Sequence, residues 1–319
     1  MATIDASQDY DFISTLTFDS ASGTCNIRLY RGSSSAFAGT VYYRNGTSGS
    51  WTSLSVSGTA TTFPVGDTTM QVANDWNKNG NDYMTQSFFG QTTNLAEISI
   101  SQKAIVSGVV GNYFFYVFAF NCPNATSIDS PDISGATSIG NYCMYNYAGF
   151  CSDLTTLEIP KISGLTSVGS YFMRAYAADC SSLLTLEAPD TSNIVTSGEG
   201  FMYAYAEDCS SLTSLGIPDT SSFITTNNFF MDLYANRCNS LERLELPVVG
   251  WFASNNIDWS VPSGRLNTLK GYVKNSTDLS DWQGEVSSGE TLYTNYIRST
   301  SDVVLEEILS GNALSMSNF

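Results

Sequence analysis

A repeat with a fixed interval constrains the fold of this chain more than any other feature. Cysteine recurs every 29 residues, at Cys122, Cys151, Cys180, Cys209 and Cys238. Proline keeps the same interval at Pro131, Pro160, Pro189, Pro218 and Pro247, and an apolar residue does so at Ile128, Leu157, Leu186, Leu215 and Leu244. Several columns in phase, without insertion or deletion between residues 111 and 248, indicate one structural unit repeated along the chain.

Each unit has two patterns in succession. The apolar residues between Phe172 and Leu183 recur at steps of three and four, which predicts one buried face of a short helix or helical turn. Residues 154–160, LTTLEIP, alternate between apolar and polar and end in proline, which predicts a short strand. Because such a unit cannot bury its own apolar face, we expect the units to stack into an α/β solenoid.

The motif resembles a known repeat family. Residues 201–218, FMYAYAEDCSSLTSLGIP, are similar to the BspA-type leucine-rich repeat, and the resemblance covers about residues 86–275. The units here are longer than is usual for that family, and the segment after the proline, such as DTSNIVTSGEG at 190–200, carries the extra length. Family members are surface proteins of bacteria and parasites, with similar repeats in virus-encoded proteins. The resemblance therefore implies a leucine-rich-repeat solenoid that works in adhesion or partner binding, without implying one chemistry.

The flanks differ from the repeat and divide the chain into three expected parts. Residues 1–85 contain short alternating segments between Gly, Ser and Asn-Gly turns, which predict a small antiparallel β-domain, a sandwich. Residues 86–248 form the solenoid, with five in-phase units after a degenerate first one. Residues 249–319 are expected to form a C-terminal cap and tail.

Charge and composition exclude several classes of partner. The net charge of -17 repels phosphate backbones and anionic lipid headgroups, so we expect no nucleic-acid partner. No run of about 18 apolar residues occurs, so we expect no membrane insertion. The chain has no histidine, the commonest general base near neutral pH, and we expect it not to be an enzyme.

The surface composition points outside the cell. Ser, Thr, Asn, Gly and Tyr are abundant and Lys and Glu are sparse, as on an exposed outer surface, yet the N-terminus does not resemble a secretory signal. A virus structural protein carried on the particle satisfies both observations. A secreted chain whose leader has been removed is the alternative. We therefore expect a location on a virion surface, or an extracellular or cell-surface location.

Two columns on the predicted strands are the candidate ligand-binding residues. The residue between the second Leu and the Ile of each strand is expected to point away from the core, and it is frequently acidic. Beside it runs a column of hydroxyls. Together they provide Asp129, Thr156, Glu158, Thr185, Glu187, Ser214 and Glu245. Acid and hydroxyl groups on a preformed sheet suit sugars, cations or a basic protein patch, whereas a solvated face that only keeps the sheet soluble is the simpler interpretation, which we favour.

A candidate metal loop precedes the repeat. Residues 75–82, DWNKNGND, place Asp75, Asn77 and Asn79 at the first, third and fifth positions of a calcium-loop pattern, with Asp82 nearby. Gln86 stands where a bidentate Glu would be, and Lys78 adds positive charge. We favour an ordinary Asn-Gly turn and expect no cofactor, with a calcium ion as the alternative.

Two buried columns are expected to serve packing. The cysteines lack the spacing of a zinc site and are expected to be reduced, buried thiols. The tyrosines at Tyr147, Tyr176, Tyr205 and Tyr234 could stack against sugars, but alanine beside each of them favours packing between coils.

Three functions fit these features. The first is a non-enzymatic recognition or attachment protein, an adhesin or a phage tail or head fibre, that binds a host cell-surface protein or glycan. The second is a structural decoration protein of a virion, attached to a larger assembly or to other copies of itself. The third is a polysaccharide-degrading enzyme with Glu158 and Glu187 as its carboxylate pair, which we rank last because a regular column gives both carboxylates the same environment.

Overall fold

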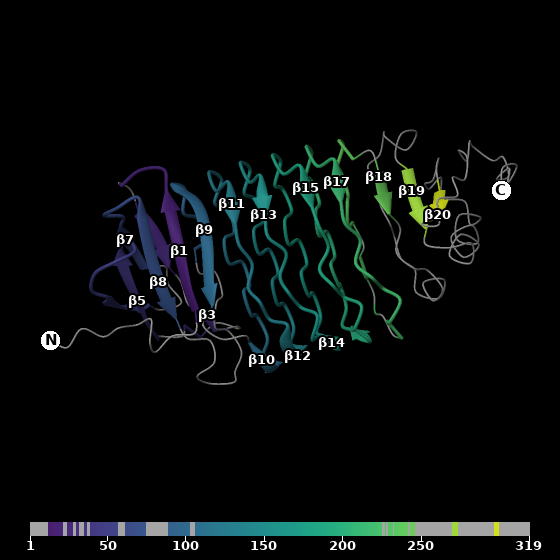
Figure 1. Ribbon diagram of the computed structural model, residues 1–319, viewed down its shortest axis with the longest axis horizontal. Coiled ribbons are helices and arrows are strands. Elements are labelled where there is room, and N and C mark those ends of the chain that lie inside the picture. Colours follow the sequence, from purple (N-terminus) through teal and green to yellow (C-terminus); the bar gives the residue numbers. More distant parts are fainter. Residues whose placement is uncertain are drawn as a thin grey trace, which may run out of the picture.

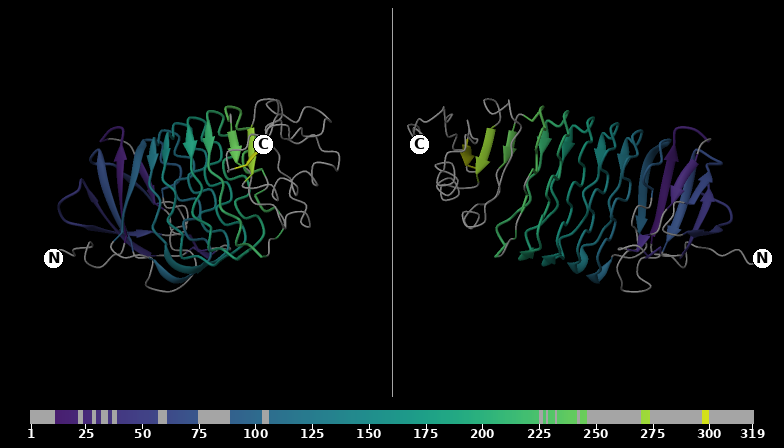
Figure 2. Two further views of the ribbon diagram at one scale, coloured as in Figure 1. Left: turned by 45° about the vertical axis from the view of Figure 1, so that its right-hand side comes forward. Right: turned by 180° about the vertical axis from the view of Figure 1, so that it is seen from behind.

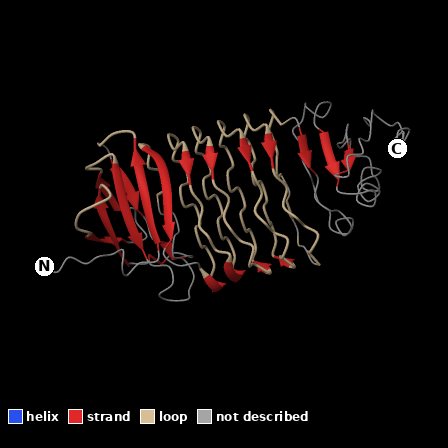
Figure 3. Cartoon of the chain, in the orientation of Figure 1, coloured by secondary structure: helices blue, strands red, loops and turns tan. Residues whose placement is uncertain are grey.

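In the computed structural model, all regular secondary structure among the described residues is β-strand. The described residues are 12–21, 24–27, 30–31, 35–36, 39–56, 61–74, 89–102, 106–224, 227, 229–231, 233–241, 243–245, 270–273 and 297–299. They form twenty strands, and no helix occurs among them (Figure 3). Of the C-terminal part predicted at 249–319, only the two short segments in this range are described.

An antiparallel sheet lies at the N-terminal end (Figure 1). Its strands, in spatial order, are β9 (Leu95–Gln102), β1 (Phe12–Phe18), β8 (Thr69–Asn74), β5 (Gly39–Asn45) and β6 (Thr52–Val56). Two small antiparallel pairs accompany it: β2 (Thr24–Ile27) with β7 (Thr61–Pro64), and β3 (Tyr30–Arg31) with β4 (Ser35–Ala36). β9 also pairs with the first repeat strand in parallel, so one seven-stranded sheet continues across the boundary predicted at residue 85.

The repeat region is a β-solenoid of about four turns, whose coils lie side by side in every view (Figures 1 and 2). One parallel sheet contains β10 (Ser107–Val110), β12 (Gly135–Ile139), β14 (Ser167–Val168) and β16 (Thr196–Ser197). The apolar column from Ile128 to Leu244 lies on β11 (Ser127–Ile128), β13 (Thr156–Leu157), β15 (Thr185–Leu186), β17 (Ser214–Leu215) and β18 (Arg243–Glu245), and β19 (Lys270–Val273) and β20 (Ile297–Ser299) follow these strands. The first two belong to the seven-stranded sheet, and the other five form their own.

The predicted helix of each unit is wrong, and so is the α/β class. In its place the chain runs through a segment whose residues alternate between left-handed and other conformations. Three columns have φ between 48° and 60° in successive coils: Tyr113, Tyr142, Tyr171 and Phe229; Phe115, Met144, Met173, Met202 and Met231; and Val117, Asn146, Ala175, Ala204 and Leu233. Gly200, with φ of 68°, occupies the first column in the remaining coil. We call each such stretch the alternating segment.

Hydrogen bonds between coils replace those of a helix. The Val117 N–H donates to the Tyr145 carbonyl at 2.7 Å, and the Asn146 N–H donates to the Arg174 carbonyl at 2.8 Å. A helix would instead bond each N–H to the carbonyl four residues earlier. A left-handed residue other than glycine costs roughly 1–2 kcal/mol. The alternating segment is stable because its neighbour in the next coil satisfies the backbone groups that it exposes.

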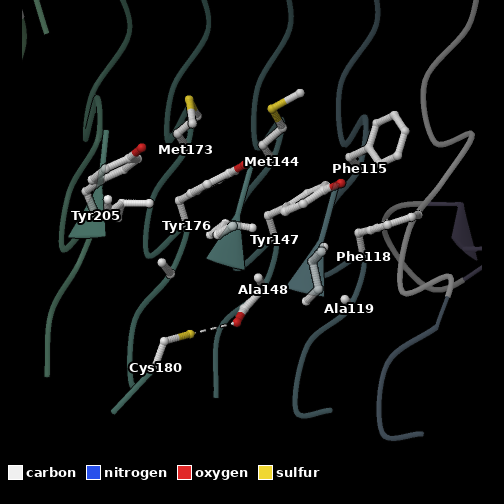
Figure 4. Close-up of a cluster of buried hydrophobic side chains, with 14 of the residues drawn as sticks. Phe115, Phe118, Ala119, Met144, Tyr147, Ala148, Met173, Tyr176, Cys180 and Tyr205 are labelled. Atoms are coloured by element: carbon white, nitrogen blue, oxygen red, sulfur yellow. Dashed lines mark hydrogen bonds between the residues drawn. The ribbon is translucent and has the colours of Figure 1, made fainter. Parts of the chain in front are cut away.

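The core is made of ladders of identical or similar residues. Tyr147, Tyr176, Tyr205 and Tyr234 are buried, and their rings stack with centroids 5.1–5.4 Å apart. Figure 4 shows the first three of them. Each hydroxyl donates to a backbone carbonyl of the strand region, as from Tyr147 to Asp129 at 2.6 Å and from Tyr205 to Glu187 at 2.9 Å. The prediction that these tyrosines serve packing is confirmed, and their rings are inaccessible to a sugar.

The cysteine column is a second ladder in this core. All seven cysteines are free thiols, and all are buried. The Cys180 thiol donates to the Ala148 carbonyl at 3.1 Å, and Cys151 and Cys209 make the equivalent contact with Ala119 and Ala177. Burial raises the pKa of Cys180 to about 12, so this thiol stays protonated and unreactive at neutral pH.

Candidate functional site

The hydroxyl column lies in register along the strands of the Leu column. Ser127 pairs with Thr156 between β11 and β13, and Thr185 pairs with Ser214 between β15 and β17. The residues Thr156, Thr185 and Ser214 are exposed. Within the described part of the chain, no hydrogen bond holds the hydroxyls of these three residues. They can therefore both donate to and accept from a ligand.

The threonines next to this column are already engaged by the backbone. The Thr155 hydroxyl donates to the Thr126 carbonyl at 3.1 Å, and the Thr213 hydroxyl donates to the Leu184 carbonyl at 3.1 Å. Each bond joins one coil to the coil before it. These hydroxyls hold the strand edges together, so they differ from the hydroxyl column although the residue type is the same.

The acidic column divides into bound and open carboxylates. Asp129 Oδ2 accepts the Ile100 N–H at 3.0 Å, and Glu158 Oε2 accepts the Ser130 N–H at 3.2 Å. Both bonds link a carboxylate to the backbone of the preceding coil, which orients the side chain. Glu187 is exposed, and no hydrogen bond to a described residue holds its carboxylate. Backbone hydrogen bonds therefore orient the carboxylates of Asp129 and Glu158, whereas none from a described residue orients that of Glu187.

Two of the predicted sites extend beyond what the structure describes. The backbone of Glu245 lies in β18, but its side chain is outside the described atoms. The candidate calcium ligands Asp75, Asn77, Asn79 and Asp82 all lie outside the described residues. Among the residues that are described, no three His, Cys, Asp or Glu side chains are grouped so that they could hold a metal ion.

A separate charge cluster lies at the end of the alternating segments. Asp179, Glu207 and Asp208 gather around Arg237, whose guanidinium contacts Glu207 at 3.2 Å and Asp208 at 2.5 Å. The pKa of Asp179 is raised, first by its burial and then by the negative charges of Asp208 and Glu207, although Arg237 opposes the shift. The folded state therefore penalises an ionised Asp179.

Replacing this aspartate should stabilise the protein at neutral pH. Because the folded pKa is above the unfolded one, the folded state binds more protons, and stability is lost as the pH rises through these values. We expect Asp179→Asn to raise the free energy of unfolding at pH 7 by less than about 1 kcal/mol, since solvent screens the site, and the gain to vanish near pH 3. Urea unfolding at both pH values measures this. Asp19→Asn, an exposed change in the N-terminal sheet, is the control, and an equal gain in both variants would contradict the prediction.

Sequence reasoning missed an outer row of aromatic residues. Tyr113, Tyr142 and Tyr171 are only half-buried, and they stack on the outer side of the alternating segments with centroids 5.0 and 5.1 Å apart. Tyr116 and Tyr145 form a second row, with centroids 5.0 Å apart. These columns keep the same interval as the buried tyrosines. The signal was therefore present in the sequence, but the prediction covered only the column of Tyr147, Tyr176, Tyr205 and Tyr234.

Comparisons with known proteins add no further assignment. Family models, curated proteins and solved structures each return no match to this chain. In the part of the chain that the structure describes, no helix has the length and apolar character needed to cross a membrane.

Proposed function

We propose that this chain is a non-enzymatic recognition or attachment protein that binds a host cell-surface protein or glycan from an outer surface. The observation that carries the proposal is the column of exposed hydroxyls and carboxylates on the β-solenoid, whose strands pair in register within each sheet. Such a face is preformed, so a ligand that binds it need not order flexible loops, and the entropic cost of binding is low. An adhesin or a fibre on a virion or cell surface would use it in this way.

The finer description of the fold belongs to the same proposal. We assign the solenoid to leucine-rich units of 29 residues, of the type found in BspA-like surface proteins. Hydrogen bonds between residues 29 apart support this unit, as from Thr166 to Thr137 and from Ser170 to Asn141. The proposed division of the chain is a β-domain at 1–85, the solenoid at 86–248, and a cap and tail at 249–319.

An enzymatic role has less support. A retaining glycosidase needs two carboxyl groups about 5 Å apart whose environments give one of them the role of acid. Glu158 accepts a backbone N–H and both side chains are exposed, so neither carboxylate is enclosed in an apolar pocket. A decoration role on a virion, with contacts to other copies or to the particle, remains the second proposal.

Cell binding tests the recognition proposal directly. Fluorescently labelled protein is incubated with intact Gram-negative bacteria, Gram-positive bacteria and epithelial cells, and bound fluorescence is measured by flow cytometry. We expect saturable binding to one cell type, and a loss of about tenfold in affinity for Glu158→Gln combined with Glu187→Gln. Asp19→Asn combined with Asp67→Asn removes the same charge from exposed positions in the N-terminal sheet and should bind normally.

Two results would count against this proposal. Binding that is unchanged in the Glu158→Gln, Glu187→Gln protein would remove the strand face from recognition. A native protein that binds none of the three cell types would instead favour the decoration role. Far-UV circular dichroism of each variant establishes that it is folded before its binding is interpreted.

A further inference from the structure

The outer aromatic residues form one continuous surface, which we call the tyrosine ladder. Its first row is Tyr113, Tyr142 and Tyr171, and its second row is Tyr116, Tyr145, Arg174 and Tyr203. Edge-to-face contacts join the rows, as between Tyr113 and Tyr116 at 5.5 Å. All seven side chains are half-buried, so the surface is packed from below and open to solvent above.

The geometry of the rows leaves part of each ring uncovered. Tyr113 and Tyr142 are nearly parallel, with planes 7° apart, and their centroids are 5.0 Å apart. Carbon atoms in contact lie only about 3.5–4.0 Å apart. Two parallel rings in contact at this centroid distance must therefore be displaced sideways, in the offset-stacked arrangement that aromatic pairs prefer. Each ring offers a strip of its face to a ligand that runs along the row, while the Tyr171 hydroxyl is hydrogen-bonded to Glu199.

Arg174 replaces a tyrosine in the second row without interrupting it. Its guanidinium lies 4.6 Å from the Tyr203 ring centroid and 5.3 Å from those of Tyr145 and Tyr171. Such cation–π contacts hold the guanidinium among the rings, and its N–H groups are hydrogen-bond donors. Partial burial, and then the neighbouring Tyr145, raise the pKa of Tyr116, so this phenol also stays a neutral donor.

The border of the ladder is also mostly uncharged. Asn112, Asn141 and Ser170 occupy successive coils immediately before the first row. Their positions are set by the backbone, since Asn112 Oδ1 accepts the Asn141 N–H at 2.7 Å and Asn141 Oδ1 accepts the Ser170 N–H at 2.8 Å. In the next coil this column has Glu199, whose side chain hydrogen-bonds Tyr171 and whose charge is opposite to that of Arg174. A ligand of this surface therefore meets amides, hydroxyls and rings, with almost no net charge.

We propose that the tyrosine ladder binds a linear, uncharged polysaccharide lying along the solenoid axis. The C–H faces of pyranose rings suit exposed aromatic faces, and sugar hydroxyls suit phenols, amides and a guanidinium. The rows repeat every 5.0–5.1 Å, close to the length of one sugar in an extended chain, so successive sugars can meet equivalent sites. A polyanion is disfavoured, because the surface holds one arginine on a chain of net charge -17.

Affinity electrophoresis in native gels tests this proposal. The gels contain hydroxyethylcellulose, xylan, galactomannan or, as the anionic comparison, polygalacturonate. We expect retardation by at least one of the three neutral polymers and none by polygalacturonate. Tyr142→Ala combined with Tyr145→Ala should weaken retardation by about tenfold in the apparent association constant. Phe150→Ala removes an aromatic ring that is 45% exposed but lies off the ladder, and it should bind as the native protein does.

A conservative variant separates binding from folding. Tyr142→Phe combined with Tyr145→Phe keeps both rings and should be retarded more strongly than the alanine pair, because the ring faces remain. Absence of retardation by all three neutral polymers overturns the proposal, as does retardation that persists in a folded alanine pair. A concentration-dependent dimer in ultracentrifugation that the alanine pair abolishes would also overturn it, in favour of a second copy as the occupant.

This inference concerns a different segment of each coil from the strand face. The variants at Tyr142 and Tyr145 leave Glu158 and Glu187 intact. The glutamate variants likewise leave both tyrosines intact. Cell binding that depends on the glutamates without polysaccharide binding would overturn the ladder proposal alone. Polysaccharide binding by the native protein, together with cell binding that the glutamate changes do not affect, would overturn the strand-face proposal alone.

Discussion

Deleting residues 151–179 is expected to leave a folded but shorter solenoid, whereas deleting residues 151–178 is expected to abolish cooperative folding. The first deletion joins Phe150 to Cys180 and keeps every later column in phase with the coil before it. The second shifts each later residue by one position. In a strand, such a shift moves the buried set of side chains to the solvent face. Leu186 and the later Leu residues would then lose their places in the core.

The in-phase deletion should cost only what one coil contributes. Folded proteins have about 0.05–0.15 kcal/mol of stability per residue, so we expect a loss of roughly 1.5–4 kcal/mol for one coil. Stability in repeat proteins is a sum over units and their interfaces, which makes removal of a whole unit tolerable. Thermal unfolding followed by near-UV circular dichroism, which reports the ordered tyrosines, distinguishes the two proteins. Similar cooperative transitions in both would contradict a 29-residue unit.

Replacing Tyr176 with alanine should be the most destabilising single substitution in the ladder of buried tyrosines. The side chain is fully buried, and its ring stacks between Tyr147 and Tyr205 at 5.2 and 5.4 Å. Its hydroxyl donates to the Glu158 carbonyl at 2.8 Å and lies 2.5 Å from Ser130 Oγ. A large aromatic residue replaced by alanine in a packed core costs about 3–5 kcal/mol, and we expect a loss in this range.

Tyr176→Phe separates the ring from its hydroxyl. It keeps the stacking but leaves the Glu158 carbonyl and Ser130 with one hydrogen-bond partner fewer, so we expect a loss of about 1–2 kcal/mol. Urea unfolding of both variants gives the two values. Phe150→Ala, at an exposed position, is the matched control and should cost less than either. A Tyr176→Ala protein as stable as the Phe150→Ala protein would contradict the packing that we describe.

The error over the helix has a specific physical cause. The alternating segment buries residues in adjacent pairs, such as Phe114 with Phe115 and then Phe118 with Ala119, separated by the half-buried Tyr116 and Val117. This burial repeats about every four residues, close to the 3.6 residues of an α-helix. Hydrophobic periodicity alone cannot distinguish the two. The hydrogen bonds that decide between them run to the next coil, so they are not visible in any single unit.

The candidate site was predictable in part. The interval of 29 residues placed Thr156, Thr185 and Ser214 in one column, and the structure exposes all three. The same interval could not show that Glu158 is bound to the backbone of the preceding coil while Glu187 is open, because the contacts of a side chain with a neighbouring coil exist only in the folded structure. It also could not distinguish the inner tyrosine Tyr147 from the outer tyrosine Tyr145, which lies two residues earlier.

The sequence by itself determined that this protein is a stack of equivalent coils, because columns such as Cys151 and Leu157 must meet their counterparts to be buried. The alanine next to each of Tyr147, Tyr176, Tyr205 and Tyr234 also indicated that these four tyrosines would pack. Only the tertiary structure decided the conformation between the strands and the side chains that face outward. Left-handed residues such as Tyr142 and Met144 are unfavourable in an isolated chain, and the carbonyl and amide groups of neighbouring coils make them stable.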